Sequence, residues 1–453
     1  MFPIFLAACS SDGDEIFDEN STMRLRAVLD NCAEAVLQPE HGWKMLYAPD
    51  LSKYGGYNVL MKFETDGEVR MYTDFLDEES VSSYSFNGSQ GPVLSFDTQS
   101  CLHYLADPSQ VPVGTGHKGE FEFVIQDITA DSLVFTGKKY GQRIVFYPAE
   151  EEDWTTRMEA YRSNIEMLVP YNNAPYFRGL TLNQTAVNLS YFPDSRTVSY
   201  TYCDEATKEV HVGQVGVFGT ENGVKFMPKI KVNGVVLDEL KYNQKLGVFE
   251  AGTPGVVGVL TYSHKPPFPF YGSVQMLKNG SNIASLPKFA DFSGGLSNVA
   301  EILNAVVSLV NLSSLMSEEL SNSYPSLLIA GMKQFRLSWS LEYEGEAVGP
   351  WFSLFGGKTL LEAADQTADF RLSMEMLREE GDQIKFKDAF DIRRHPDSED
   401  ATFQTNMLNT DGFTTFFNFI TDPAGFTVVP ESGRIYTLVN LADSRRWIRL
   451  TKE

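Results

Sequence analysis

The chain has 453 residues, of which 43% are hydrophobic and 21% charged, so it is a globular protein long enough for more than one hydrophobic core. Its 60 Asp and Glu residues against 37 Lys and Arg give a formal net charge of -23, which repels a phosphate backbone and argues against a nucleic-acid partner. The same acidity disfavours adsorption onto anionic lipid headgroups, so attachment to a membrane requires an anchor.

The first residues have the form of a truncated bacterial lipoprotein signal. Residues 6–9, LAAC, place small side chains before a cysteine whose thiol can carry a lipid. A complete signal also has a cationic start and ~7–15 apolar residues, so we interpret the start as placed too far downstream; an N-terminal buried strand is the alternative. The acidic tether at 10–15 resembles the signal that sends lipoproteins to the outer face of the outer membrane. We expect Cys9 to carry a permanent lipid anchor.

The next part of the chain predicts a helix followed by β-strands. Residues 21–38 have apolar side chains at helical spacing, with Ser21 or Thr22 available as a cap. From residue 56 to 148 the hydrophobic period is two, and seven or so short β runs at hairpin spacing predict an antiparallel barrel or sandwich. A second amphipathic helix over 150–169, stopped by Pro170, marks the end of this domain.

Strands return over residues 176–264, with hairpin turns at 221–223 and 233–234. A broad apolar pattern over 296–322 predicts a third helix, buried between domains and too often interrupted by polar residues to span a bilayer. Strands resume at residue 334. We expect the last strands at residues 414–420, 426–430, 434–441 and 446–451.

The sequence therefore predicts a mainly β fold with a few amphipathic helices (α+β), built from antiparallel barrel- or sandwich-like domains. Aromatic residues, 13% of the chain, also favour strands. The expected parts are a truncated signal and tether over 1–20, a helix plus antiparallel β domain over 21–170, a second β domain over 171–290, and a helix plus C-terminal β domain over 291–453.

Cysteine and histidine residues form no strong metal or redox motif. We expect the three remaining cysteines to be buried, with at most one bridge. They are Cys32, Cys101 and Cys203. His103, His117 and Glu120 would approach one another if residues 101–105 paired with residues 119–123, giving two imidazoles and a carboxylate. We favour the alternative that they are solvated loop residues, and we expect no metal.

Two glycine-rich stretches are weak candidates for phosphate binding. Residues 114–119 fit GxGxxG, but an alternating strand follows where a dinucleotide site needs a helix. Residues 355–359, FGGKT, have Phe352 at the position where a phosphate loop needs glycine. We therefore expect no cofactor. No catalytic residue is assigned, because a carboxylate pair for glycoside hydrolysis cannot be named among 60 acids.

Clustered aromatic residues are candidates for ligand binding, since exposed ring faces stack on sugars. Four of them lie near one predicted loop: Trp43, Tyr47, Tyr54 and Tyr57. Three more lie near another, at Phe268, Phe270 and Tyr271. Packing inside the core or a hairpin is the competing interpretation for each.

Several blocks follow one another in a distinctive order and spacing: HGWKMLYAPD, GGYNVLMKF, SSYSF, GPVLSFDTQSCLHYLADPS, GEFEFVI, FTGKKYGQRIVFYP and FGTENGVKFMPKIKVNGVVLDELKYN. In this order they resemble an uncharacterised family of Bacteroidota surface lipoproteins, known only as a domain of unknown function. The resemblance covers about residues 15–250. It implies a full lipoprotein signal and a gene beside SusC/SusD-type uptake systems and a zinc-dependent peptidase lipoprotein, but no activity.

From these features we expect a lipid-anchored protein of the outer-membrane cell surface. Its expected role is that of a non-catalytic accessory in the capture of a nutrient, either a glycan or a peptide, with a SusC/SusD-type uptake complex as a partner. The alternatives are a hydrolase whose carboxylate pair is not recognised and a structural adhesin or assembly protein.

Overall fold

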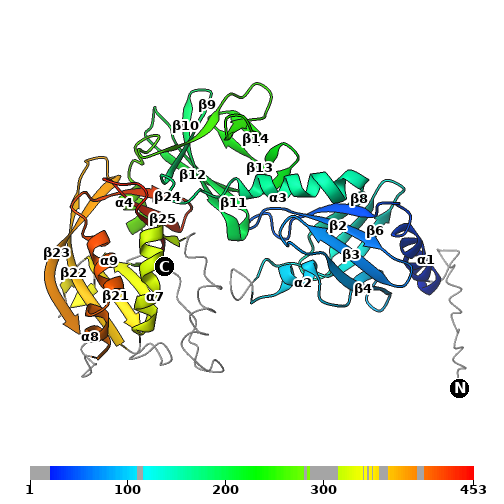
Figure 1. Ribbon diagram of the computed structural model, residues 1–453, viewed down its shortest axis with the longest axis horizontal. Coiled ribbons are helices and arrows are strands. Elements are labelled where there is room, and N and C mark those ends of the chain that lie inside the picture. Colours follow the sequence, from blue (N-terminus) through cyan, green and yellow to red (C-terminus); the bar gives the residue numbers. More distant parts are fainter. Residues whose placement is uncertain are drawn as a thin grey trace, which may run out of the picture.

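The computed structural model describes residues 21–109, 116–279, 283–285, 315–339, 341–343, 346–348, 350–356, 366–394 and 402–452. Cys9 and residues 296–314 of the helix expected over 296–322 lie outside these residues. In the described part, three antiparallel sheets form three barrels, each with its own hydrophobic core (Figure 1). The prediction of a mainly β fold with a few helices is therefore confirmed.

The first barrel comes from the N-terminal part of the chain, drawn in blue to cyan (Figure 1). The barrel is closed by the pairing of β1 with β8. Its elements are α1 (Ser21–Ala35), β1 (Trp43–Tyr47), β2 (Tyr57–Phe63), β3 (Glu68–Thr73), β4 (Ser80–Asn87), β5 (Val93–Phe96), α2 (Cys101–Ala106), β6 (Glu122–Ile128), β7 (Leu133–Gly137) and β8 (Arg143–Pro148). Residues 101–105, considered as a strand, belong to helix α2, which buries Cys101, Leu102 and Leu105 at helical spacing.

The middle barrel follows the second predicted helix, which is confirmed as one turn of π-helix continued by α3. The elements are η1 (Asp153–Arg157), α3 (Met158–Glu166), β9 (Phe177–Leu182), β10 (Thr185–Phe192), η2 (Pro193–Ser195), β11 (Thr197–Cys203), β12 (Val210–Thr220), β13 (Gly223–Val232), β14 (Val235–Asn243), β15 (Val248–Ala251) and β16 (Val259–Ser263). Both predicted hairpin turns are confirmed, because β12 pairs with β13 across 221–222 and β13 pairs with β14 across 233–234.

The third barrel begins before residue 290, where we expected the second domain to end. Its elements, after α4 (Ser273–Lys278), are β17 (Ile283–Ser285), α7 (Glu318–Ile329), β18 (Met332–Ser338), β21 (Trp351–Gly356), β22 (Gln366–Met376), β23 (Gln383–Arg394), α8 (Thr402–Leu408), α9 (Asp411–Ile420), β24 (Phe426–Pro430), β25 (Ile435–Asn440) and β26 (Trp447–Lys452). A separate two-stranded sheet pairs β19 (Leu341–Tyr343) with β20 (Glu346–Val348). Of the predicted helix over 296–322, residues 318–322 belong to α7.

The expected strand at 414–420 is wrong, because these residues form the greater part of helix α9. Phe413, Phe416, Phe419 and Ile420 are buried at a spacing of three and four residues, so the helix buries one aromatic face. Thr410 caps this helix by accepting a hydrogen bond from the Phe413 amide at 3.4 Å. No helix in the described ranges has the length and apolar character required to cross a membrane.

The middle barrel lies between the other two, which occupy opposite ends of the molecule (Figure 1). A buried ion pair of the third barrel faces the middle barrel: Arg449 Nε lies 2.6 Å from Glu431 Oε2. Tyr176 and Ser190 both donate hydrogen bonds to the other carboxylate oxygen of Glu431. The Arg449 guanidinium also lies over the Phe192 ring, 4.4 Å from its centroid. Polar groups of both barrels thus surround one buried carboxylate.

Candidate functional site

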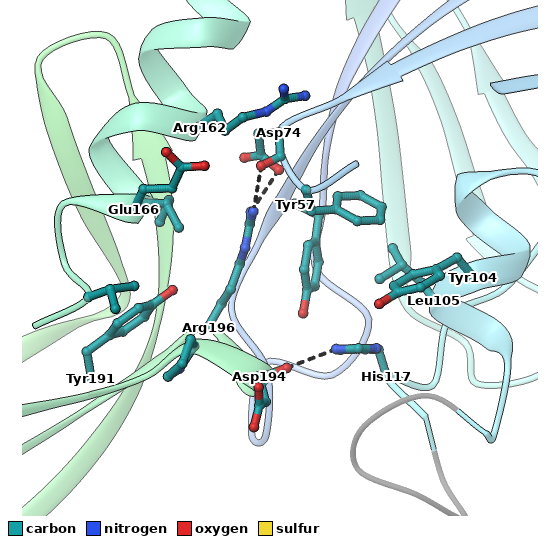
Figure 2. Close-up of a pocket in the computed structure, with 14 residues that line it drawn as sticks. Tyr57, Asp74, Tyr104, Leu105, His117, Arg162, Glu166, Tyr191, Asp194 and Arg196 are labelled. Atoms are coloured by element: carbon teal, nitrogen blue, oxygen red, sulfur yellow. Dashed lines mark hydrogen bonds and ion pairs between the residues drawn. The ribbon is translucent and has the colours of Figure 1, made fainter. Parts of the chain in front are cut away.

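A cleft of about 430 Å³ lies between the first barrel and the middle barrel, with α3 along one side (Figure 2). Both barrels contribute aromatic and charged side chains to it. The lining residues are Tyr57, Asp74, Phe75, Tyr104, Leu105, His117, Arg162, Ile165, Glu166, Val169, Tyr191, Pro193, Asp194 and Arg196. Clefts between domains are common ligand sites, which makes this cleft the candidate functional site.

A buried ion pair crosses the cleft from one barrel to the other (Figure 2). Arg196 Nη1 lies 2.7 Å from Asp74 Oδ1, and the two residues are 5% and 2% exposed. Arg196 Nη2 donates to the Asp74 carbonyl at 2.9 Å, and Asn58 Nδ2 donates to Asp74 Oδ2 at 2.7 Å. Both carboxylate oxygens of Asp74 therefore have partners. A buried ion pair requires this, because the cost of removing the two charges from water is offset only when their polar atoms are hydrogen-bonded.

The backbone conformation at Arg196 directs its guanidinium toward the first barrel. Arg196 lies between η2 and β11 with φ +49, in the left-handed region. Next to it, the Gly55 amide of the first barrel donates to the Ser195 carbonyl at 2.8 Å. A Cβ atom on Gly55 would lie 2.1 Å from the Arg196 carbonyl oxygen, so only glycine permits this approach of the two backbones.

Helix α3 is hydrogen-bonded to both barrels. Arg162 Nη2 donates to the carbonyls of Thr73 and Leu76 in the first barrel, at 2.8 and 2.6 Å. Asn164 Nδ2 donates to the carbonyl of Thr220 in the middle barrel at 2.8 Å. The helix therefore adds a third connection between the two walls of the cleft.

The floor of the cleft is aromatic and contains two polar atoms without hydrogen-bond partners in the described part of the chain. The Tyr57 ring lies beneath the Arg196 guanidinium at 4.7 Å and meets the His117 ring edge-on at 5.6 Å. His117 Nε2 lies 2.9 Å from the Asp194 carbonyl, so Nε2 carries the proton and Nδ1 is an acceptor. Tyr57 Oη and His117 Nδ1 are both buried and unpartnered.

Burial keeps both groups neutral. It raises the pKa of the Tyr57 hydroxyl far above its ordinary value, so this oxygen remains a donor. It lowers the pKa of His117, so the ring remains uncharged at neutral pH. The floor therefore offers one free donor and one free acceptor.

Of the four aromatic residues proposed for ligand binding, only Tyr57 lines the cleft. All four are no more than 3% exposed, so they do not form an exposed stacking surface. Trp43 Nε1 donates to the Val36 carbonyl at 2.9 Å, Tyr47 Oη accepts from the Glu120 amide at 2.7 Å, and Tyr54 Oη donates to the Gly116 carbonyl at 2.8 Å. The strand β1 places Trp43 and Tyr47 in the core of the first barrel.

The second aromatic group is also partly in the core. Phe270 is fully buried and packs against Phe268, with ring centroids 4.8 Å apart. Tyr271 lines a separate cavity of about 310 Å³, where Lys208 Nζ lies 5.6 Å from its ring centroid. These residues lie away from the cleft lined by Tyr57.

The suggested metal group is not formed, and the favoured interpretation as solvated loop residues is also wrong, because His117 and Glu120 are 6% and 3% exposed and His103 lies in helix α2. His103 stacks on Phe121 at 4.2 Å, and the Glu120 carboxylate accepts from the amides of Lys139 and Tyr140 at 2.5 Å each. Within the described ranges, no cluster of three or more His, Cys, Asp or Glu residues could hold a metal ion. The cysteines at 32, 101 and 203 are buried and free, without a bridge. Residues 114–115 and 357–359 of the two glycine-rich stretches lie outside the described residues.

Sequence patterns did not identify Asp74, Arg196 or Arg162, the charged residues that shape this cleft. Two local signals point toward them in retrospect. The Gly55-Gly56 pair marks a close backbone approach, and the turn at 193–196, PDSR, places a basic residue at the end of a tight bend in an acidic chain.

Comparison with known families shows a match over residues 13–244 to a family described as a domain of unknown function, DUF4302. Curated proteins give no match. Among solved structures, a DNA polymerase III subunit beta sliding clamp (DnaN) from Bartonella birtlesii LL-WM9 is 12% identical with a TM-score of 0.11, over 81% of this chain and 95% of the clamp. A likeness this low carries no argument about fold or function.

The Asp74→Ala variant tests the ion pair across the cleft. It leaves the Arg196 charge buried without its carboxylate, so we expect the free energy of unfolding to fall by about 3 kcal/mol. Urea unfolding followed by circular dichroism measures this loss. Asp77→Ala is the matched control, because the Asp77 side chain is 96% exposed and pairs with Arg162 at 3.4 Å. Equal effects of the two substitutions would contradict the assignment.

The buried His117 predicts a pH dependence of stability. Its pKa is lowered in the folded protein, so the unfolded chain binds a proton more readily and stability decreases as pH falls below about 6.5. His117→Gln keeps a donor for the Asp194 carbonyl but does not titrate. Melting temperatures at pH 7.5 and 5.5 should therefore fall more in the wild type than in the variant, whereas equal falls would exclude this role for His117.

Proposed function

This chain belongs to the DUF4302 family, a domain of unknown function, and we propose that it is a non-catalytic protein that captures a neutral polyhydroxylated ligand, such as a glycan segment, in the cleft between its first two barrels. The observation that carries the proposal is the pair of unpartnered polar atoms at the aromatic floor, Tyr57 Oη and His117 Nδ1. A sugar hydroxyl both donates and accepts, so it can supply the partner that each atom lacks.

The walls of the cleft support the same ligand class. Tyr104 is half-buried and lines the cleft, and its ring is tilted by 26° from that of His117 with the centroids 6.4 Å apart, so it provides an apolar ring face for a sugar. Arg196 and Asp74 are already paired with each other, so a charged ligand gains little from either of them. A neutral glycan fits this arrangement better than a charged peptide.

The hydrogen bonds made by the buried Asp74 carboxylate favour a binding role over a hydrolytic one. General acid or base catalysis requires a carboxylate that can exchange a proton with the substrate. Asp74 has both of its oxygens occupied, by Arg196 and by Asn58. The cleft therefore holds Asp74 as a structural anion.

The proposed setting is the outer face of the outer membrane, with the chain anchored by a lipid on Cys9 and delivering its ligand to a SusC/SusD-type uptake complex. The sequence at residues 6–15, a small-residue cysteine motif followed by an acidic tether, supports the anchor. The excess of 60 acidic over 37 basic residues means that attachment to an anionic membrane requires such an anchor, because charge alone would not hold the protein there.

Binding is tested by isothermal titration with a panel of soluble oligosaccharides and of uncharged capped peptides. We expect an oligosaccharide to bind without turnover, and Tyr104→Ala to weaken its binding about tenfold through lost ring stacking. Tyr140→Ala is the control, since Tyr140 is 45% exposed in the first barrel and outside this cleft. Release of shorter sugars would show a hydrolase, and equal weakening by both variants would place the site elsewhere.

The anchor is tested with Cys9→Ala, expressed from an upstream-extended start and compared with the wild type by acyl labelling and protease shaving of intact cells. The wild type should be labelled and shaved, whereas the variant should be unlabelled and lost from the surface. An unlabelled, soluble wild type would overturn the proposed location without affecting the proposed ligand.

A further inference from the structure

The middle barrel contains a second cavity, of about 480 Å³, with a buried arginine at its wall. Arg178 lies on β9, directly opposite Tyr262 of β16. Its side chain is on the same face of the strand as Leu180 and Leu182, which belong to the barrel core. Arg178 is 4% exposed, so its guanidinium is removed from water at the end of that core.

The guanidinium of Arg178 has no carboxylate partner in the described part of the chain. Its Nη1 donates to the Leu168 carbonyl at 2.6 Å, and its Nε is buried without a partner. The cavity lining contains no Asp or Glu. In contrast, the other two arginines that are less than a tenth exposed in the described ranges pair with Asp74 and Glu431.

The electrostatic consequences differ accordingly. Burial lowers the pKa of Arg178, since only tyrosines lie near enough to oppose this effect. Burial acts on Arg196 in the same direction, but Asp74 and two tyrosines outweigh it and raise that pKa. A guanidinium keeps its proton at neutral pH in proteins, so Arg178 remains a buried cation. Such a charge is costly unless an anion accompanies it.

We propose that Arg178 binds the carboxylate of a small organic acid whose apolar body occupies this cavity. The walls fit such a body, because Tyr171, Tyr242, Phe249 and Leu260 line the cavity beside Arg178. The Tyr171 and Tyr262 rings meet edge-on at 5.0 Å and 71°, and the Arg178 guanidinium lies 5.1 Å from the Tyr262 centroid. A single cation with an aromatic surround suits a monocarboxylate.

A carboxylate of this kind has two sources, a free organic acid or the C-terminus of a peptide. In both, the planar carboxylate matches the guanidinium donors. The proposal does not depend on the ligand of the cleft between the barrels, because Tyr57 and His117 do not line this cavity.

Isothermal titration of the full chain tests the proposal with 3-phenylpropanoate and with Gly-Phe, each compared with its neutral amide. We expect saturable binding of one molecule per chain for at least one acid, and at least tenfold weaker binding of its amide. The acid that binds more tightly identifies the source of the carboxylate. Absence of binding by both acids, or equal affinity for an acid and its amide, would overturn the proposal.

Two variants locate the site. Arg178→Met removes the charge at similar volume, and Val248→Trp fills the cavity while leaving Arg178 in place; each should reduce affinity for the acid at least tenfold. The control is Arg70→Met, since the Arg70 side chain is 45% exposed on the first barrel. If Arg178→Met fails to fold, Val248→Trp still decides the outcome. Wild-type affinity in the folded variants would overturn the assignment.

Discussion

The ion pair between Arg196 and Asp74 is the constraint on which the arrangement of the first two barrels depends. Two buried charges are tolerated only when each satisfies the other, and here every oxygen of the carboxylate is bonded. The barrels must therefore meet in the one orientation that brings these residues to 2.7 Å. The Gly55 contact and helix α3 hold the same orientation by backbone and side-chain hydrogen bonds. The aromatic cleft is a consequence of that fixed docking.

One hairpin of the middle barrel, formed by β10 and β11, contacts both the first and the third barrel. Its tip carries Arg196 toward the first barrel, while the strands themselves face the third barrel. Ser190 donates to the Glu431 carboxylate at 3.1 Å, and Thr201 donates to the Pro430 carbonyl at 2.8 Å. The two strands are hydrogen-bonded to each other, with Ser190 opposite Ser199. The hairpin therefore positions the first barrel at its tip and the third barrel along its strands. The middle barrel thus holds the outer two in a defined relation.

Sequence periodicity predicted the strands well, because a barrel wall with one buried face gives a clean period of two. It failed where aromatic residues are equally suited to a strand and to a buried helix, as at 414–420, whose spacing of three and four residues is the helical signal. It also grouped Trp43 and Tyr47 near a loop as candidate ligand-binding residues, although they alternate in strand β1 and face the core. The ion pair could not be predicted from sequence patterns, because Asp74 and Arg196 are 122 residues apart and only the fold brings them together.

We conclude that the first two barrels form one rigid unit around their buried ion pair. Electron paramagnetic resonance distances between spin labels at positions 81 and 236 test it directly, since both valines are exposed, at 49% and 39%, on the first and the middle barrel. Cys9→Ala is the background, and the cysteines at 32, 101 and 203 are buried. A rigid unit gives one narrow distance distribution, which should broaden in Asp74→Ala. A distribution that is already broad with Asp74 in place would show that the two barrels move independently.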